Sequence, residues 1–169
     1  KIKSVVIDYK GKQVDGNAFN IDVVKEFKAT SKNPQQRQYA LYTYTNDEGK
    51  VKYIIPMAGN GLWGPVWAYV ALKDDQNTID GVVFDHKSET PGLGAEITQK
   101  WFRNKFTNEP KKILDENGEY KSIQLVKGGV KNPTHEVDAI AGSTITSKGV
   151  SKMLQENFKP FMLYWNKIK

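Results

Sequence analysis

The chain has 169 residues, of which 38% are apolar, so it is long enough for a single domain with its own core, and we expect residues 1–169 to form one domain. It contains no cysteine and only two histidines, His86 and His135. These counts exclude disulfides, thiolate metal sites, cysteine-bound iron–sulfur clusters and cysteine nucleophiles, and they argue against a multi-histidine metal site. Any redox chemistry must therefore come from an organic cofactor.

The formal net charge is +6 and the isoelectric point is about 9.3. A net positive charge favours binding to nucleic acid, to an anionic membrane surface or to an acidic protein partner. The lysines are spread along the chain without a cluster of five or more, so we predict no nucleic-acid binding. No apolar run is long enough to span a membrane. Because the chain begins at Lys1 without Met or a signal-type apolar core, we expect a trimmed or processed product whose upstream part is missing.

The first third of the chain predicts strands joined by a hairpin. Residues 4–8 and 39–45 have the composition of strands, and a polar turn separates the second of them from a return strand over residues 51–56. Between the first two strands, residues 19–28 have apolar side chains on one side of a short helix.

The middle of the chain predicts a second hairpin. Residues 66–72 and 78–84 are apolar, β-branched or aromatic runs on either side of a polar turn, and we expect them near the sheet centre. Residues 97–106 have apolar side chains at helical spacing, and residues 122–126 predict another short strand.

The C-terminal segment predicts the longest helix. From Ser147 onward the apolar residues recur at helical spacing, and we expect a bend near Pro160. Because the strands come in hairpins with helices appended, the predicted class is α+β, an antiparallel sheet with flanking helices.

One candidate site lies in residues 85–96, after a strand and before a helix. Gly92 and Gly94 permit backbone conformations and close ligand approaches that other residues resist, and Leu93 between them would be an apolar loop tip able to touch a flat ligand. The alternative is a tight strand-to-helix turn without a ligand.

The second candidate lies in residues 138–147, where Ser143, Thr144 and Thr146 precede the long helix. Unpaired N–H groups and the positive end of the helix dipole favour a phosphate there. The alternative is that a Ser or Thr hydroxyl simply caps the helix. The glycine spacing fits neither a dinucleotide fingerprint nor a P-loop.

Two further features are compatible with a flat anionic ligand. In the aromatic stretch 61–69, Trp63 lies among glycines and is the better candidate for stacking on a ring. Lys127, before two glycines, either places a cation near a phosphate or flavin ring or belongs to a solvated turn.

Hydrolytic chemistry is not indicated. His135 lies nine residues before Thr144, but no Ser–His–acid arrangement is legible. Glu89 and Glu96 have no second feature that would make them a glycosidase pair.

Taken together, these segments resemble one family, the covalent FMN-binding domain of the C-type subunit of the sodium-translocating NADH:quinone reductase, which is related to the G-type subunit of the Rnf electron-transport complex. The resemblance covers about two thirds of the chain, from Ile54 to the C-terminus. Residues 89–94 read ETPGLG like the family loop, and residues 61–68 read GLWGPVWA like the tryptophan-containing stretch typical of the reductase subunit. The Rnf subunit usually lacks those tryptophans, so the reductase subunit is favoured.

The flavinylation motif of that family resembles Asp-Gly-x-Ser/Thr-Gly-Ala-Thr/Ser. Asp138, Gly142 and Thr144 fall on its acidic, glycine and acceptor positions. The chain departs from it at residues 139, 141 and 143, and Ser143 adds a competing hydroxyl. We predict Thr144 as the acceptor, because it keeps the spacing from Asp138 and Gly142.

The resemblance implies an electron-transfer subunit that carries FMN on Thr144 through a phosphoester bond made by a separate flavin transferase. It also implies other reductase subunits as partners, a membrane anchor upstream, and a domain on the periplasmic side of a bacterial inner membrane. The alternatives are an Rnf-type subunit, a module that binds a flavin or phosphate ligand noncovalently, and a structural domain without a cofactor. The residues expected at the FMN site are Trp63, Glu89, Thr90, Gly92, Leu93, Gly94, Lys127, Asp138, Ala141, Gly142, Ser143, Thr144 and Thr146.

Overall fold

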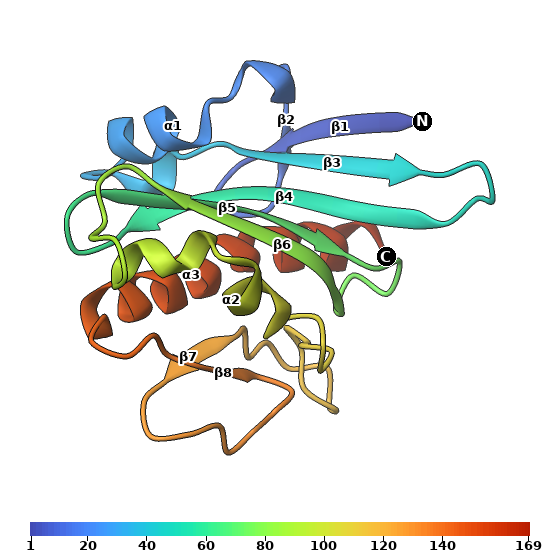
Figure 1. The fold of residues 1–169 in the computed structure, drawn as a ribbon. Coiled ribbons are helices and arrows are strands. Elements are labelled where there is room, and N and C mark those ends of the chain that lie inside the picture. Colours follow the sequence, from blue (N-terminus) through green and yellow to red (C-terminus); the bar gives the residue numbers. More distant parts are fainter.

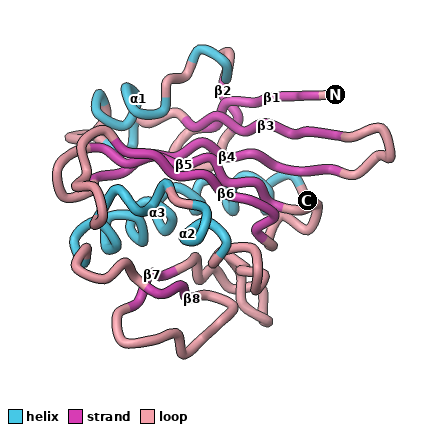
Figure 2. The backbone as a smooth tube through the Cα atoms, in the orientation of Figure 1, coloured by secondary structure: helices cyan, strands magenta, loops and turns pink.

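The computed structural model describes all residues 1–169 and is built around one six-stranded antiparallel sheet in the order β2-β1-β3-β4-β5-β6 (Figures 1 and 2). Helices α2 and α3 lie on one side of this sheet and the short helix α1 on the other (Figure 1). The strands are β1 (Ile2–Ile7), β2 (Gln13–Val14), β3 (Tyr39–Thr45), β4 (Val51–Asn60), β5 (Pro65–Leu72) and β6 (Ile79–His86). The predicted α+β class with an antiparallel sheet is confirmed.

Alternation along the central strands places the core on the α3 side of the sheet. Ile55 and Met57 of β4 and Val66 and Val70 of β5 are fully buried and belong to a single cluster of 27 core residues. Side chains of a strand alternate between the two faces, so their neighbours turn toward α1 or solvent. Tyr69, for example, is 46% exposed.

Helix α3 (Thr144–Ile168) supplies the other half of this core and continues through Pro160. Its buried side chains include Leu154, Phe158 and Phe161. The helix lies so close to the end of β4 that a Cβ on Gly149 would come within 2.0 Å of the carbonyl oxygen of Asn60. This contact holds the first turns of α3 beside the β4–β5 loop. None of the helices, α3 included, combines the length and the apolar character needed to cross a membrane.

Two predicted helices are shorter than expected. The segment 19–28 divides into a 3₁₀ turn (Ala18–Asn20) and α1 (Val23–Ala29), because Asp22 caps the helix by accepting hydrogen bonds from the N–H groups of Val24 and Lys25. The segment 97–106 likewise divides into a 3₁₀ helix (Gly94–Thr98) and α2 (Lys100–Asn104). The β5–β6 hairpin, expected near the sheet centre, is at its edge, since β6 is an outer strand.

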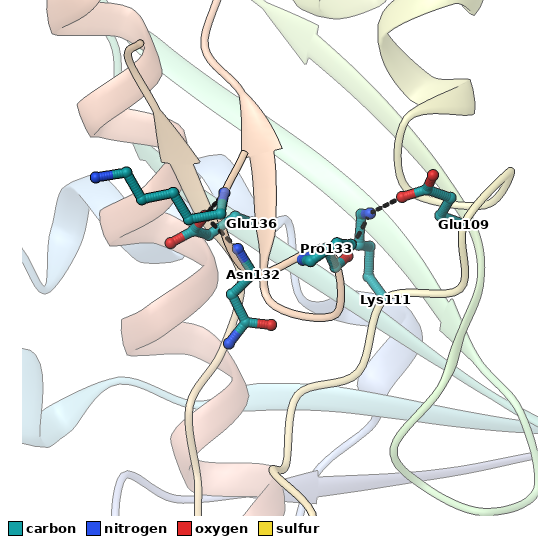
Figure 3. A network of polar contacts seen from close by, with 6 residues as sticks. Glu109, Lys111, Asn132, Pro133 and Glu136 are labelled. Atoms are coloured by element: carbon teal, nitrogen blue, oxygen red, sulfur yellow. Dashed lines mark hydrogen bonds and ion pairs between the residues drawn. The ribbon is translucent and has the colours of Figure 1, made fainter. Parts of the chain in front are cut away.

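A small parallel pair, β7 (Gln124–Val126) and β8 (Glu136–Asp138), lies beyond α3. The polar network in Figure 3 holds the loop between them. Glu136 accepts hydrogen bonds from the N–H groups of Lys131 (2.7 Å) and Asn132 (2.9 Å), and the buried Lys111 donates to the carbonyl of Pro133. The sequence predicted β7 but not β8, which carries Asp138 toward the start of α3.

Candidate functional site

Three segments predicted to form a site converge on one buried carboxylate, that of Glu89, which is 4% exposed. Its Oε2 accepts a hydrogen bond from the hydroxyl of Thr146 at 2.5 Å, and its Oε1 accepts one from the N–H of Trp63 at 2.9 Å. A buried carboxylate is tolerated only when hydrogen bonds replace its hydration. Glu89 therefore ties together residues 61–64, 88–94 and 142–146, which we call the Glu89 corner.

Glycines let this corner close around the carboxylate. A Cβ on Gly94 would lie 2.6 Å from both Glu89 Oε2 and Thr146 Oγ1, and a Cβ on Gly61 would lie 2.4 Å from Glu89 Oε1. No other residue fits either position without moving the loops. Gly94 was expected to let a ligand come close to the backbone. In the structure, the groups that come close to it are the side chains of Glu89 and Thr146.

The first turn of α3 has no protein cap. The helix begins at Thr144, three residues before the predicted start, and no side chain caps it. The backbone N–H groups of residues 144–146 donate to no protein acceptor, and the buried Ser143 Oγ has no hydrogen-bond partner. The simple capping interpretation is therefore wrong. Unpaired N–H groups with an orphaned hydroxyl fit a phosphate.

The three hydroxyl-bearing residues at this helix start differ in their exposure to solvent. Ser143 is 6% exposed, and Thr146 is 2% exposed with its hydroxyl donating to Glu89 rather than facing a ligand. Thr144 is exposed. Of the three, Thr144 alone presents its hydroxyl to an incoming reagent.

Exposed apolar side chains lie on the segments that form the corner and on the first turn of α3. Trp63 is 64% exposed, Ile145 57%, Leu62 45% and Leu93 42%. Leu93 packs against the turn at Gly142, because a Cβ there would come within 3.1 Å of its Cδ2. Exposed apolar side chains gathered beside an uncapped helix start indicate a binding surface.

Thr90 and Gly92 shape the loop that carries Leu93. The carbonyl of Thr90 accepts hydrogen bonds from the N–H groups of Leu93 and Ala95, and Gly92 has a φ of +75°. The predicted apolar loop tip at Leu93 is confirmed, and its position follows from this turn.

Lys127 and Asp138 lie on the other flank of the helix start. The parallel register pairs Val126 with Asp138, and the N–H of Ala139 donates to the carbonyl of Val126. Lys127, Asp138 and Ala141 are exposed. The two charges therefore neighbour the chain that leads into Thr144, without hydrogen bonds to the Glu89 corner.

The histidines and Glu96 have structural roles. His135 Nδ1 lies 2.8 Å from the carbonyl oxygen of Lys112, and His86 Nδ1 accepts a hydrogen bond from the N–H of Glu89. Glu96 accepts one from the indole of Trp101. Sequence reasoning missed His86 and Leu62 as parts of the corner, because their contacts involve a ring nitrogen and a backbone N–H that no pattern reveals.

The fold and the uncapped helix start suit a domain that holds a phosphate-bearing ligand. The family model for the FMN-binding domain matches residues 61–159. In structure, the chain is similar to the C-type subunit of the Na(+)-translocating NADH-quinone reductase from Parabacteroides distasonis, with a TM-score of 0.82, 40% identity, and 96% of this chain and 76% of that chain covered. It is also similar to NqrC from Shewanella oneidensis, with a TM-score of 0.78, 29% identity, and coverage of 99% and 85%.

A sequence relative is the C-type subunit of the same reductase from Neisseria meningitidis serogroup A, 37% identical over 132 residues, which are 76% of this chain and 50% of that protein. The chain thus belongs to the FMN-binding domain family, in its NqrC branch from Na+-translocating NADH-quinone reductases. It spans about half the length of the Neisseria relative.

Proposed function

We propose that this chain is the FMN-carrying domain of an electron-transfer subunit in a Na+-translocating NADH:quinone reductase, with FMN esterified to Thr144. The observation that carries the proposal is the exposed Thr144 hydroxyl at an uncapped helix start, next to the buried and unpartnered Ser143 Oγ. Family membership supports FMN as the ligand.

Attachment joins the Thr144 oxygen to the FMN phosphorus and breaks the pyrophosphate bond of FAD. The hydroxyl proton leaves and AMP departs. A threonine hydroxyl is a weak nucleophile without an adjacent base, and the two histidine Nδ1 atoms are engaged elsewhere. A separate flavin transferase therefore supplies the base, and the exposure of Thr144 gives it access.

The residues of the corner fit the attached group in distinct ways. The N–H groups of residues 144–146 would hold the phosphodiester, while Trp63 and Leu93 would offer apolar surface to the ring. When bound, FMN supplies the electron acceptance and donation. The protein keeps this cofactor at a high local concentration through the covalent tether.

The remaining proposals concern the whole complex. Partners are the other subunits of the reductase, which supply the NADH and quinone sites. An upstream anchor tethers the domain to a bacterial inner membrane, with the domain on the periplasmic side. Family membership and the net charge of +6 are compatible with this placement beside an anionic surface.

The test is Thr144→Ala in protein coexpressed with a flavin transferase. We expect complete loss of covalent flavin, read as the intact mass after denaturation, with a stability change within about 0.5 kcal/mol, because the exposed Thr144 caps no N–H group. Ser143→Ala is the matched control and should retain the flavin. Flavin that persists in Thr144→Ala, or that leaves the denatured wild-type chain, contradicts the proposed ester.

A further inference from the structure

A groove outside the Glu89 corner lies between α3 and the N-terminal third of the chain. Its volume is about 690 Å³. One wall is α3 at Met153, Glu156 and Pro160, and the other comes from Phe27, Arg37 and Tyr39. The second wall belongs to the region before residue 61, which the FMN-binding family model does not cover.

A buried arginine lies in this groove without an acidic partner. Arg37 is 7% exposed, and no carboxylate comes within ion-pair distance of its guanidinium. Its Nε donates to the hydroxyl of Thr30 at 2.8 Å, and its guanidinium stacks on the ring of Phe27, 4.7 Å from the centroid. These two contacts fix the plane of the guanidinium. A buried charge is normally paired with an opposite charge, and Arg37 makes no ion pair.

The charge around Arg37 has one dominant sign. Lys10, Lys152 and Lys159 also line the groove, and Glu156 is the single acid among its lining residues. That acid already faces Lys152 at 3.7 Å. The Tyr39 hydroxyl, whose pKa is raised to about 12 by burial, adds a neutral donor to the same groove. Cations and a hydroxyl donor that share one concave surface recognise an oxyanion.

The walls of the groove are apolar around these charges. Phe27, Met153 and Leu163 line it together with the rings of Tyr9 and Tyr39. Ligand sites generally combine such walls with a few polar groups that fix orientation. The groove therefore suits a flat or aliphatic body that carries one acidic head group.

The groove and the Thr144 hydroxyl use different flanks of α3. Thr144 lies on the helix stripe of Ser151, seven residues later, whose hydroxyl accepts a hydrogen bond from the N–H of Leu125 in β7. Gly149, Met153 and Pro160 define the stripe that borders Arg37. A group attached at Thr144 therefore starts on the β7 side of the helix.

We propose that this groove is a second ligand site, in which Arg37 binds the carboxylate or phosphate of a small molecule with an apolar body. The site is distinct from the flavin attachment site and is occupied independently of FMN. Arg37 provides a two-pronged hydrogen bond to the anion, and Phe27 holds the guanidinium in position for it.

The test is calorimetric titration of the unflavinylated chain with 1-naphthoate, 1-naphthyl phosphate and the neutral 1-naphthalenemethanol. We expect saturable binding of at least one anion, about tenfold or more tighter than the alcohol, since a charge-assisted pair is lost in the alcohol. The two anions distinguish a carboxylate site from a phosphate site. Equal binding of all three probes, or no saturable binding, overturns the proposal without the need for any variant.

Arg37→Gln should weaken the preferred anion about tenfold while the alcohol is unaffected, and Lys25→Gln, an exposed lysine away from the groove, is the matched control. Unchanged anion binding in a folded Arg37→Gln chain counts against the proposal. Repetition on the flavinylated chain should give the same affinities. Loss of binding after flavinylation overturns the proposal, because the groove would then belong to the attached flavin.

Discussion

The Glu89 corner and the Arg37 groove each contain one buried charge, and the two charges are used in opposite ways. Glu89 is 4% exposed and accepts hydrogen bonds from Thr146 and Trp63, with glycines packed against it. Arg37 is 7% exposed and faces a groove of about 690 Å³, with no carboxylate within ion-pair distance. Protein hydrogen-bond donors enclose the Glu89 carboxylate, whereas the Arg37 guanidinium has an open groove in front of it.

This difference separates scaffold from binding surface. A fully satisfied buried polar network rigidifies the segments that it joins. In the corner, Glu89 fixes the segments beside Thr144 but makes no hydrogen bond to Thr144 itself. The buried carboxylate therefore supports the exposed hydroxyl without binding a ligand. In the groove, the unpaired charge is itself the binding feature. Burial of a charged side chain does not by itself identify a ligand contact.

The largest effect is expected at Gly149, which lies between the two regions. Gly149→Ala places a Cβ 2.0 Å from the carbonyl oxygen of Asn60 and forces α3 away from β4. We expect a net loss of about 3 kcal/mol in the free energy of unfolding, because overpacking outweighs the gain in helix propensity. Chemical denaturation measures it.

Gly81→Ala is the control for this substitution, since a Cβ there meets no atom within 4 Å. It should be close to neutral. If Gly149→Ala were equally neutral, the corner and the groove would not share a rigid helix.

The next effect concerns the corner alone. Glu89→Gln replaces one of the two carboxylate oxygens with an NH2 group, so either the Trp63 N–H or the Thr146 hydroxyl loses its acceptor. We expect a loss of about 2 kcal/mol, together with reduced flavinylation by the transferase because Thr144 loses its rigid support. Thermal unfolding and intact mass report the two effects.

Arg37→Gln is the counterpart in the groove and should cost only about 1 kcal/mol, since it removes one hydrogen bond and one stacking contact. Flavinylation should be unchanged. A larger loss of stability for Arg37→Gln than for Glu89→Gln would reverse the comparison between the two charges.

The smallest effect is a pH dependence at Glu136, the first residue of β8. Hydrogen bonds from the N–H groups of Asn132 and Lys131 lower the pKa of Glu136. A carboxyl whose pKa is lowered by folding stabilises the fold above its unfolded value of about 4.3, and this contribution disappears as the pH falls through the lower folded value.

The thermal unfolding temperature of Glu136→Gln should therefore be lower than that of wild type at pH 7. This difference in unfolding temperature should shrink below about pH 4. The exposed Glu116→Gln is the control, expected to track wild type throughout. A difference between Glu136→Gln and wild type that grows toward low pH would contradict this assignment.

Much of the fold follows from local patterns. Apolar, β-branched and aromatic runs between polar turns predicted five of the six sheet strands. The missed strand β2 is two residues long and carries no such pattern. The predicted helix over residues 19–28 was too long, because Asp22 starts a new helix inside it. Strand order also escaped prediction, so the β5–β6 hairpin was expected at the sheet centre when it forms an edge.

The sequence by itself determined the class of fold, the FMN-binding family and the segments that form the site, because hydrophobic periodicity and the ETPGLG and GLWGPVWA stretches are local properties of the chain. Motif spacing favoured Thr144 over Ser143 and Thr146, but it gave no physical difference between the three hydroxyls. Tertiary packing distinguished them, since Glu89 comes from a different strand end and binds Thr146 across 57 positions of the chain. The Arg37 groove likewise exists only where the N-terminal segment meets α3, because burial and the absence of a partner are properties of contacts between distant residues.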